Sequence, residues 1–250
     1  MNRQICVIVV FLAGSVMVFG DGFSISAGGG GIFGGVFTRY TLRADGDIAS
    51  IDARQQMDQF DYGFFAFVDA TYATLSFSFL NSANNWREPA HVVGMEELNF
   101  GGSGQGWGRS LGFLLMGRWP FTLNNRITVF PMLGVKYQIA LMQRRTNADG
   151  FVYDRTDGVD EGEHDRYGNP FLLSDWNAFW INLGVGADFV VLDNFFIRGE
   201  FHYGFRLMTS HERKNLNLIR HETGDDSPRL GGLTSSPSLR ISAGWQLFSR

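Results

Sequence analysis

Cysteine is almost absent from this chain, which has a single one, Cys6, among 250 residues. Cys6 lies in an uncharged apolar stretch, residues 5–19, between a basic start and the small residue Gly20. This arrangement is typical of a cleaved secretory signal peptide. We therefore expect residues 1–20 to be removed and residues 21–250 to form one domain, which has no thiol for catalysis, disulfide pairing or lipid attachment.

Long apolar runs are missing after the first twenty residues, and so are basic segments. No later stretch approaches the ~18 uncharged apolar residues of a membrane-spanning helix. With 21 basic and 25 acidic residues the formal net charge is −4, which makes nucleic acid an unexpected partner. The chain is instead rich in glycine (32) and phenylalanine (24) and has only 6 prolines. This mixture favours β-structure that packs against an apolar phase.

Polar and apolar residues alternate with the period of a β-strand in several segments. The contrast is sharpest in residues 195–207, where the even positions include Arg198, Glu200, His202 and Arg206. Clear alternation also marks residues 73–79, 127–141, 179–191 and 239–247, and a less regular form marks residues 23–40, 60–70 and 111–119. Together these segments predict eight strands. We interpret the four glycines at residues 28–31 as the site of a β-bulge.

The segments between these strands differ in length in a regular way. Short links are expected at residues 71–72, 120–126 and 192–194. Long polar loops are expected at residues 42–57, 81–107, 143–175 and 209–236. Short turns at one end and long loops at the other are typical of an eight-stranded antiparallel transmembrane β-barrel, with periplasmic turns and termini and extracellular loops.

A soluble lipocalin-like barrel also alternates, so the charge pattern has to separate the two classes. On the six predicted strands after residue 72, no position of the apolar face carries a charge. The opposite face is small and glycine-rich, as in residues 184, 186, 204 and 244, which suits a narrow lumen better than a soluble exterior. A membrane barrel is the favoured interpretation, and a soluble ligand-binding barrel is the alternative.

The chain thus resembles the small eight-stranded outer-membrane barrels of diderm bacteria, the class of OmpW, OmpX and the OmpA membrane domain. The closing residues 242–248, Ser-Ala-Gly-Trp-Gln-Leu-Phe, contribute to this resemblance. In that class the last strand usually ends on an aromatic residue that the barrel-assembly machinery recognises. Here Ser249 and Arg250 follow Phe248, which is a departure from the pattern.

Inward-facing charges are the first set of candidate site residues. The narrow interior of eight strands requires such charges to pair with one another. We expect a lumen ion-pair network of Arg118, Lys136, Asp188, Arg198, Glu200, His202, Arg206 and Arg240. A structural network is one interpretation, and gating or solute selection is the other.

A second set of inward positions is apolar. It consists of Phe65, Phe67, Leu114, Met116, Phe130 and Met132, on the second, fourth and fifth predicted strands. These residues either simply pack together or line a path for an apolar solute. OmpW-type barrels are thought to pass small hydrophobic compounds through an apolar lumen, so this set favours an OmpW-like interpretation within the class.

The resemblance implies a non-enzymatic protein of the outer membrane, with no catalytic residue, metal or cofactor. The expected function is a narrow channel for passive passage of small, including hydrophobic, solutes. The alternative is a surface protein whose loops act in adhesion or immune interaction. A lipid A-modifying enzyme is less favoured, because His202 lies beside Glu200 without an evident serine partner. Expected partners are outer-membrane lipid, the barrel-assembly machinery and either a small hydrophobic solute or a host surface ligand.

Overall fold

The computed structural model describes residues 23–45, 50–88, 90–93, 102–147, 152–155, 159–164, 170–207, 209 and 229–249. The predicted signal peptide, residues 1–20, lies outside these ranges. Almost all of the described chain is β-strand, with one short 3-10 helix, η1 (Leu173–Trp176). Within these ranges, no helix has the length and apolarity that a membrane crossing requires.

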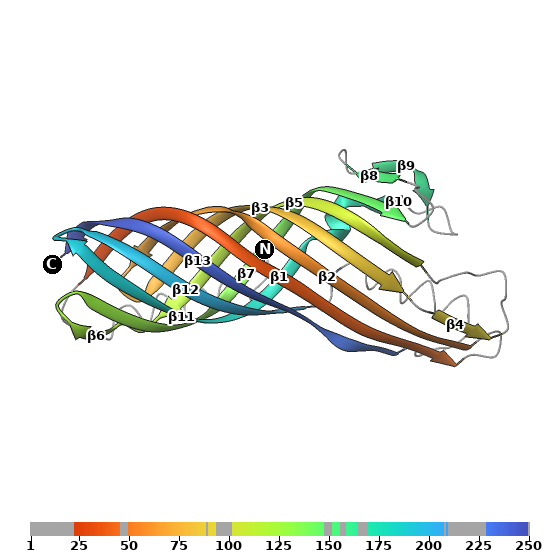
Figure 1. The fold of residues 1–250 in the computed structure, drawn as a ribbon, viewed down its shortest axis with the longest axis horizontal. Coiled ribbons are helices and arrows are strands. Elements are labelled where there is room, and N and C mark those ends of the chain that lie inside the picture. The colour runs from red at the N-terminus through yellow and green to blue at the C-terminus, as the bar shows by residue number, and fades with distance from the viewer. Residues whose placement is uncertain are drawn as a thin grey trace, which may run out of the picture.

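Eight antiparallel strands of the described chain close into a barrel (Figure 1). Each strand pairs with its neighbours in sequence, and β1 pairs with both β2 and β13, which closes the ring. The strands are β1 (Ser24–Asp45), β2 (Ser50–Ala70), β3 (Ala73–Glu88), β5 (Gly102–Arg118), β7 (Ile127–Asn147), β11 (Ala178–Leu192), β12 (Phe195–Arg206) and β13 (Arg229–Ser249). The predicted fold class, an eight-stranded antiparallel barrel, is confirmed.

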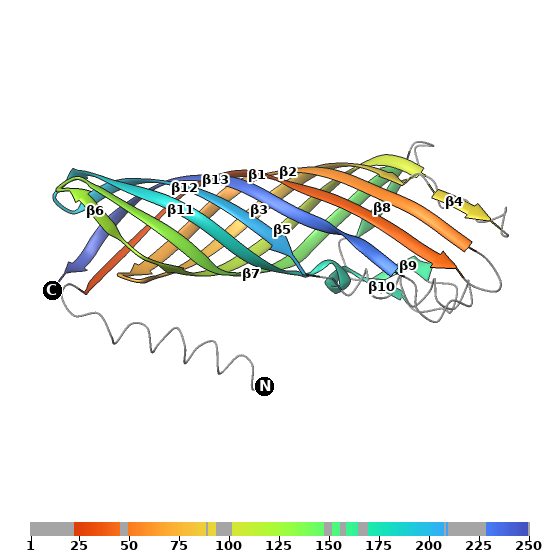
Figure 2. The ribbon, with the colours of Figure 1, turned by 90° about the horizontal axis from the view of Figure 1, so that it is seen from below.

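Short connections gather at one end of the barrel. Two-residue turns join β2 to β3 at residues 71–72 and β11 to β12 at residues 193–194. Between β5 and β7 the chain forms a small extra strand, β6 (Phe121–Asn124), which pairs with β7. The end of β13 lies at the same end as β6, as Figures 1 and 2 show. We call this the turn end.

At the opposite end the strands are longer than the sequence pattern predicted. Parts of residues 42–57, 81–107, 143–175 and 209–236 continue the barrel strands, so that β1 has 22 residues and β2, β7 and β13 have 21 each. A strand needs only about 9–11 residues to cross a bilayer. Beyond the membrane both faces of a strand can be polar, so alternation fades although the hydrogen-bonded ladder continues. The sequence pattern therefore underestimated the strands.

Further small strands lie at this end: β4 (Ala90–Val93), which extends the sheet beside β2, β8 (Val152–Arg155), which pairs with β7, and the pair β9 (Val159–His164) and β10 (Pro170–Leu172). Figure 1 shows them at the far end of the barrel from β6. We call this the extended end.

Side chains alternate between the two faces of the wall as predicted. Along β11, buried and exposed residues alternate from Ala178 to Phe189. The exposed positions are apolar, for example Phe64 at 63%, Leu75 at 57% and Ile241 at 53% exposure, whereas the lumen holds most of the buried polar residues. An apolar exterior around a polar interior is the reverse of a soluble barrel and is suited to lipid.

The glycine run of β1 is not a bulge, contrary to the sequence interpretation. Residues 28–31 stay in register with both neighbours, and the irregularity lies earlier, between Ile25 and Ser26. The glycines instead permit close packing. A Cβ on Gly28 would lie 2.7 Å from the ring of Phe67 and closer still to the backbone of β13.

Candidate functional site in the barrel lumen

The register of three neighbouring strands brings opposite charges face to face. Asp188 on β11 is the direct cross-strand partner of Arg198 on β12, and Glu200 on β12 is the partner of Arg240 on β13. Cross-strand partners share a face of the sheet. All four side chains point into the lumen and are buried, with Arg198 at 0% exposure.

Arg198 is the hub of this lumen site. Its Nη2 donates a hydrogen bond to Asp188 Oδ2 at 2.8 Å, and its Nε donates to Oδ1 of the same carboxylate, which makes a bidentate pair. Its Nη1 lies 2.7 Å from Asp69 Oδ2, an ion pair without aligned hydrogen-bond geometry, and 3.7 Å from Glu200 Oε1. One guanidinium therefore faces carboxylates from three different strands.

Three phenyl rings enclose the same guanidinium. The Arg198 Cζ atom lies 4.7 Å from the ring centroid of Phe67, 5.1 Å from that of Phe130 and 5.0 Å from that of Phe196. A desolvated cation–π contact contributes about 2 kcal/mol or more. The rings also exclude water, which strengthens the ion pairs inside them.

Arg118 forms the turn-end side of the site. Its Nη1 donates to Asp69 Oδ2 at 2.9 Å, and its Nε donates to the Thr71 carbonyl at 3.1 Å. Its Nη2 is 4.0 Å from Asp188 Oδ2, and its Cζ lies 4.7 Å from the Phe130 centroid. Asp69 is thus held between two arginines.

Arg240 and His202 surround Glu200 on the other side. Glu200 Oε2 lies 3.4 Å from Arg240 Nη1 and 3.1 Å from His202 Nε2. Arg240 Nη2 donates to Ser76 Oγ at 2.9 Å, and its Cζ lies 3.6 Å from the centroid of Phe65. This second tier connects β12 and β13 to β2 and β3 across the lumen.

The lumen site has two tiers, one around Arg198 and Arg118 and the other around Arg240 and Glu200. The charges of the two tiers balance. We define the lumen plug as the arginines and carboxylates of both tiers together with His202 and the enclosing rings: Arg118, Arg198, Arg240, Asp69, Asp188, Glu200, His202, Phe65, Phe67, Phe130 and Phe196. Three cations face three anions, and each ion has a partner of opposite sign. A buried charge left without its partner costs several kcal/mol, so this equality matters for folding.

Lys136 and Arg206 were predicted to join the network, and the structure places them farther along the lumen, around Trp180. Lys136 Nζ lies 5.6 Å from the Trp180 ring and interacts electrostatically with Asp61. Arg206 Cζ lies 5.9 Å from the same ring, and its Nη2 donates to Tyr40 Oη at 3.2 Å. They form a separate group toward the extended end.

The predicted apolar set is buried as a whole but does not form one cluster. Phe65 and Phe67 pack with Ile32, Leu80 and Phe196. The other four, Leu114, Met116, Phe130 and Met132, form a second cluster. Because Phe67 and Phe130 contact Arg198 from both clusters, the apolar and ionic sets make one plug rather than separate sides of the lumen.

Sequence reasoning missed two carboxylates, Asp69 and Asp61. Both occupy odd positions of β2, the same face that carries Phe65 and Phe67, and both are buried. The signal was present, because the placement of the two phenylalanines in the lumen fixes the direction of every other odd position. Without Asp69, the hub lacks the partner that links Arg118 to Arg198.

Above the plug the lumen keeps a cavity of about 80 Å³. It lies toward the extended end, and both aromatic and polar side chains line it, among them Trp176, Trp180, Met57, Gln138 and Arg206. The described residues contain no group of three or more histidine, cysteine or acidic residues arranged to hold a metal ion. The arrangement can bind or exclude a solute, and its arginines and carboxylates can change ion-pair partners.

A closed barrel with an apolar exterior and a polar, charged lumen defines a transmembrane β-barrel protein. No protein-family model and no curated protein matches the chain.

Solved structures that it resembles include the outer membrane protein OprG from Pseudomonas aeruginosa, with 13% identity and a TM-score of 0.41 over 90% of this chain and 96% of that chain. Another is Ail, the attachment invasion locus protein of Yersinia pestis, in complex with the heparin analogue sucrose octasulfate, with 12% identity and a TM-score of 0.34 over 90% of this chain and 98% of that chain. A third is Neisserial surface protein A, with 10% identity and a TM-score of 0.31 over 91% and all of the respective chains. At these identities no residue role is transferred.

Proposed function

We propose that this protein is a narrow, gated, non-enzymatic passage for small, partly apolar solutes in the outer membrane of a diderm bacterium. The turn end faces the periplasm and the extended end faces outward, because short turns mark the periplasmic side of such barrels. The lumen plug is the gate, and it is closed in this structure. A signal peptide at residues 1–20 delivers the chain to that membrane.

One observation carries the proposal: the fully buried Arg198, with carboxylates from β2, β11 and β12 around it. Apolar residues of similar volume fill a barrel core at least as stably as buried ion pairs do. Ionisable residues at membrane depth typically mark paths for ions or solutes. Because the hub bonds are spread over several strands, small movements of the wall exchange partners and open the lumen.

The side chains that line the small cavity beyond the plug support the proposed class of small, partly apolar solutes. Trp180 and Trp176 line the small cavity together with the polar side chains of Gln138 and Ser110. Gln138 Nε2 donates to Ser110 Oγ at 2.7 Å. The lining combines polar and apolar groups in similar measure, which suits a small solute that has both kinds of surface.

Planar-bilayer recording of the refolded mature chain tests the gate. Asp188→Asn removes one charge from the bidentate pair with Arg198 and weakens the closed state. We expect the open fraction to rise about tenfold or more, since a hydrogen bond to a charged group is worth ~1.5–3 kcal/mol and tenfold corresponds to ~1.4 kcal/mol. Asp193→Asn, the same change at an exposed turn position, leaves conductance unchanged.

A gel shift on boiling confirms that each variant is folded before recording. Wild-type and Asp188→Asn barrels that are both folded, both silent and equally inactive in uptake of small aromatic solutes by proteoliposomes contradict the gated passage.

Surface display is the second candidate function, and the strand lengths favour it. The barrel strands continue well past the length that a bilayer requires, and β4 and β8 add further edges at the extended end. Exposed strand edges are templates for pairing with another chain.

Replacing residues 152–172 by a short Gly-Ser linker is expected to abolish binding of the intact protein to host cells while conductance is retained. Unchanged cell binding by this variant argues against display through this segment.

A further inference from the structure

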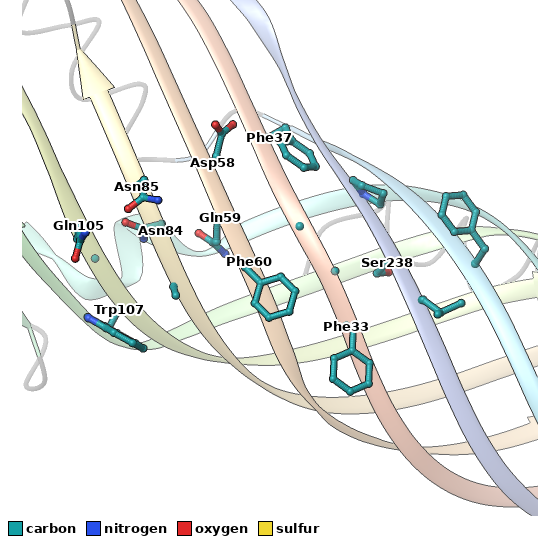
Figure 3. A pocket seen from close by; sticks show the side chains of 17 residues that line it. Phe33, Phe37, Asp58, Gln59, Phe60, Asn84, Asn85, Gln105, Trp107 and Ser238 are labelled. Carbon is teal, nitrogen blue, oxygen red and sulfur yellow. The ribbon is translucent and has the colours of Figure 1, made fainter.

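The outer wall of the barrel has a groove across six strands, from β12 through β13, β1, β2 and β3 to β5 (Figure 3). Its volume is about 710 Å³, within the usual range of ligand pockets. The side chains around it are mostly outward and apolar, among them Phe33, Phe37, Phe60, Trp107 and Leu239. The groove thus lies on the lipid-facing surface and is distinct from the lumen plug.

A missing outward side chain and an interrupted ladder create the hollow. Of the three glycines that line it, Gly35 is at an outward position, where a Cβ would lie 3.1 Å from the Phe37 ring, whereas Gly34 and Gly106 are at inward positions and contribute only backbone. The ladder of β1 with β13 passes from Gly34↔Ser238 directly to Phe37↔Ser235, and Pro237, which has no N–H, lies between. An unpaired wall segment is costly beside lipid hydrocarbon, so an occupant with polar groups suits this position better than a bare acyl chain.

The groove changes character in the same direction on three strands. On β1, Phe33 and Phe37 are followed by Arg39, and on β3, Ala83 is followed by Asn85 and Arg87. All of these alternate positions face outward, and the two arginines are exposed. Toward the extended end the surface therefore passes from apolar residues to arginine.

The antiparallel strand β5 also passes from an apolar to a polar residue toward the extended end, in the reverse sequence order, from Trp107 to the amide of Gln105. The Gln105 amide is the cross-strand partner of Asn85, which gives a pair of hydrogen-bonding groups between the apolar part and the arginines. Arg144 on β7 is the cross-strand partner of Trp107 and is also exposed.

Arg39 and Arg87 are separated by one strand, since Gln56 of β2 pairs with both. Two strand spacings amount to about 9.6 Å. Two long arginine side chains can reach across this span to the same phosphate. One carboxylate, Asp58, also lines the groove, and it accepts a hydrogen bond from Gln56 Nε2 at 3.1 Å. The exposed arginines Arg39, Arg87 and Arg144 do not line the groove itself but lie beside it on the same outer face, and they outnumber this carboxylate.

We propose that this groove binds one phosphate-bearing anionic lipid of the surrounding leaflet. An acyl chain lies against Phe33 and Phe60, the glycerol or sugar ester region meets Asn85 and Gln105, and the phosphate lies between Arg39 and Arg87. Charge complementarity carries this assignment, together with the order apolar, amide, arginine on β3 and the change from apolar to polar residues in the same direction on β1 and β5. It rests on placement of the barrel in a membrane and not on solute passage.

Native mass spectrometry of the refolded barrel tests the site, with phosphatidylglycerol and phosphatidylcholine of the same acyl chains as probes. The wild type is expected to retain one phosphatidylglycerol in preference to phosphatidylcholine. Arg39→Gln with Arg87→Gln lowers phosphatidylglycerol retention about tenfold or more and removes the preference. Arg126→Gln, at an exposed position of the turn end, is the matched control and changes neither.

A second variant separates the groove from its charged rim. Ala83→Phe fills the groove from the outer face of β3 and is expected to lower retention of both lipids without touching the arginines. Equal retention of the two lipids by the wild type, or equal losses in the rim pair and in Arg126→Gln, overturns the proposal. Conductance recorded on the same samples reports on the gate separately, so failure of one proposal is distinguishable from failure of the other.

Discussion

Replacing Arg198 by methionine is expected to lower the free energy of unfolding by about 3–5 kcal/mol, because it removes the closest cationic partner of two buried carboxylates, Asp69 and Asp188. Asp188 loses its bidentate bond, and Asp69 keeps only Arg118. Arg198→Lys retains the charge but not the fork of donors, so a smaller loss is expected. Urea unfolding in lipid vesicles measures both.

The control and the compensating variant make this first prediction specific. Arg126→Met at the exposed turn changes the free energy of unfolding by less than ~0.5 kcal/mol. The double variant Arg198→Met with Asp188→Leu removes both members of the pair and recovers most of the stability. If the double variant is as unstable as the sum of its single changes, the charges are not coupled as the structure indicates.

Gly30→Ala is expected to prevent or strongly weaken closure of the barrel. A Cβ at Gly30 would lie 2.0 Å from the Ile241 carbonyl oxygen and 2.5 Å from the Ser242 Cα, both backbone atoms of β13. Overpacking against backbone forces the β1–β13 seam apart, at an expected cost of at least about 1–3 kcal/mol. The measurement is the fraction of refolded protein that shifts on boiling, followed by urea unfolding.

The same substitution on the outer face supplies the control. A Cβ on Gly199 of β12 meets nothing within 4 Å, and Gly199 is the cross-strand partner of Ile241. Gly199→Ala is therefore expected to fold with wild-type yield. Normal closure of Gly30→Ala would mean that β1 and β13 do not approach each other as closely as described.

The membrane-embedded half of the fold could be predicted from sequence because lipid outside and a packed lumen inside impose opposite demands on alternate residues. β11 and β12 show this most clearly, and their predicted and observed limits nearly coincide. Outside the bilayer that demand ends, so the outer parts of β1, β2, β7 and β13 were taken for loops. Backbone hydrogen bonding, which leaves little trace in side-chain type, maintains the strands there.

Which charges point inward could be inferred from sequence, whereas their partners could not. The parity of β12 placed Arg198, Glu200 and His202 together, but the Asp69 contact depends on the approach of β2 across the lumen. Such cross-lumen distances follow from strand tilt and stagger, which no local pattern encodes. Arg198 is surrounded by both carboxylates and phenyl rings for the same reason, because several of them come from strands across the lumen.

In the proposed orientation, with the extended end outside the cell, the long outer strands have a consequence for immune recognition. Neighbouring positions of the outer wall, such as Thr41, Arg54 and Gly231, come from three strands and are adjacent only through the ladder. An antibody that contacts this wall recognises a discontinuous epitope, which boiling destroys together with the barrel. Short linear peptides from this region are therefore poor immunogens for it, and the folded barrel in lipid is the appropriate antigen.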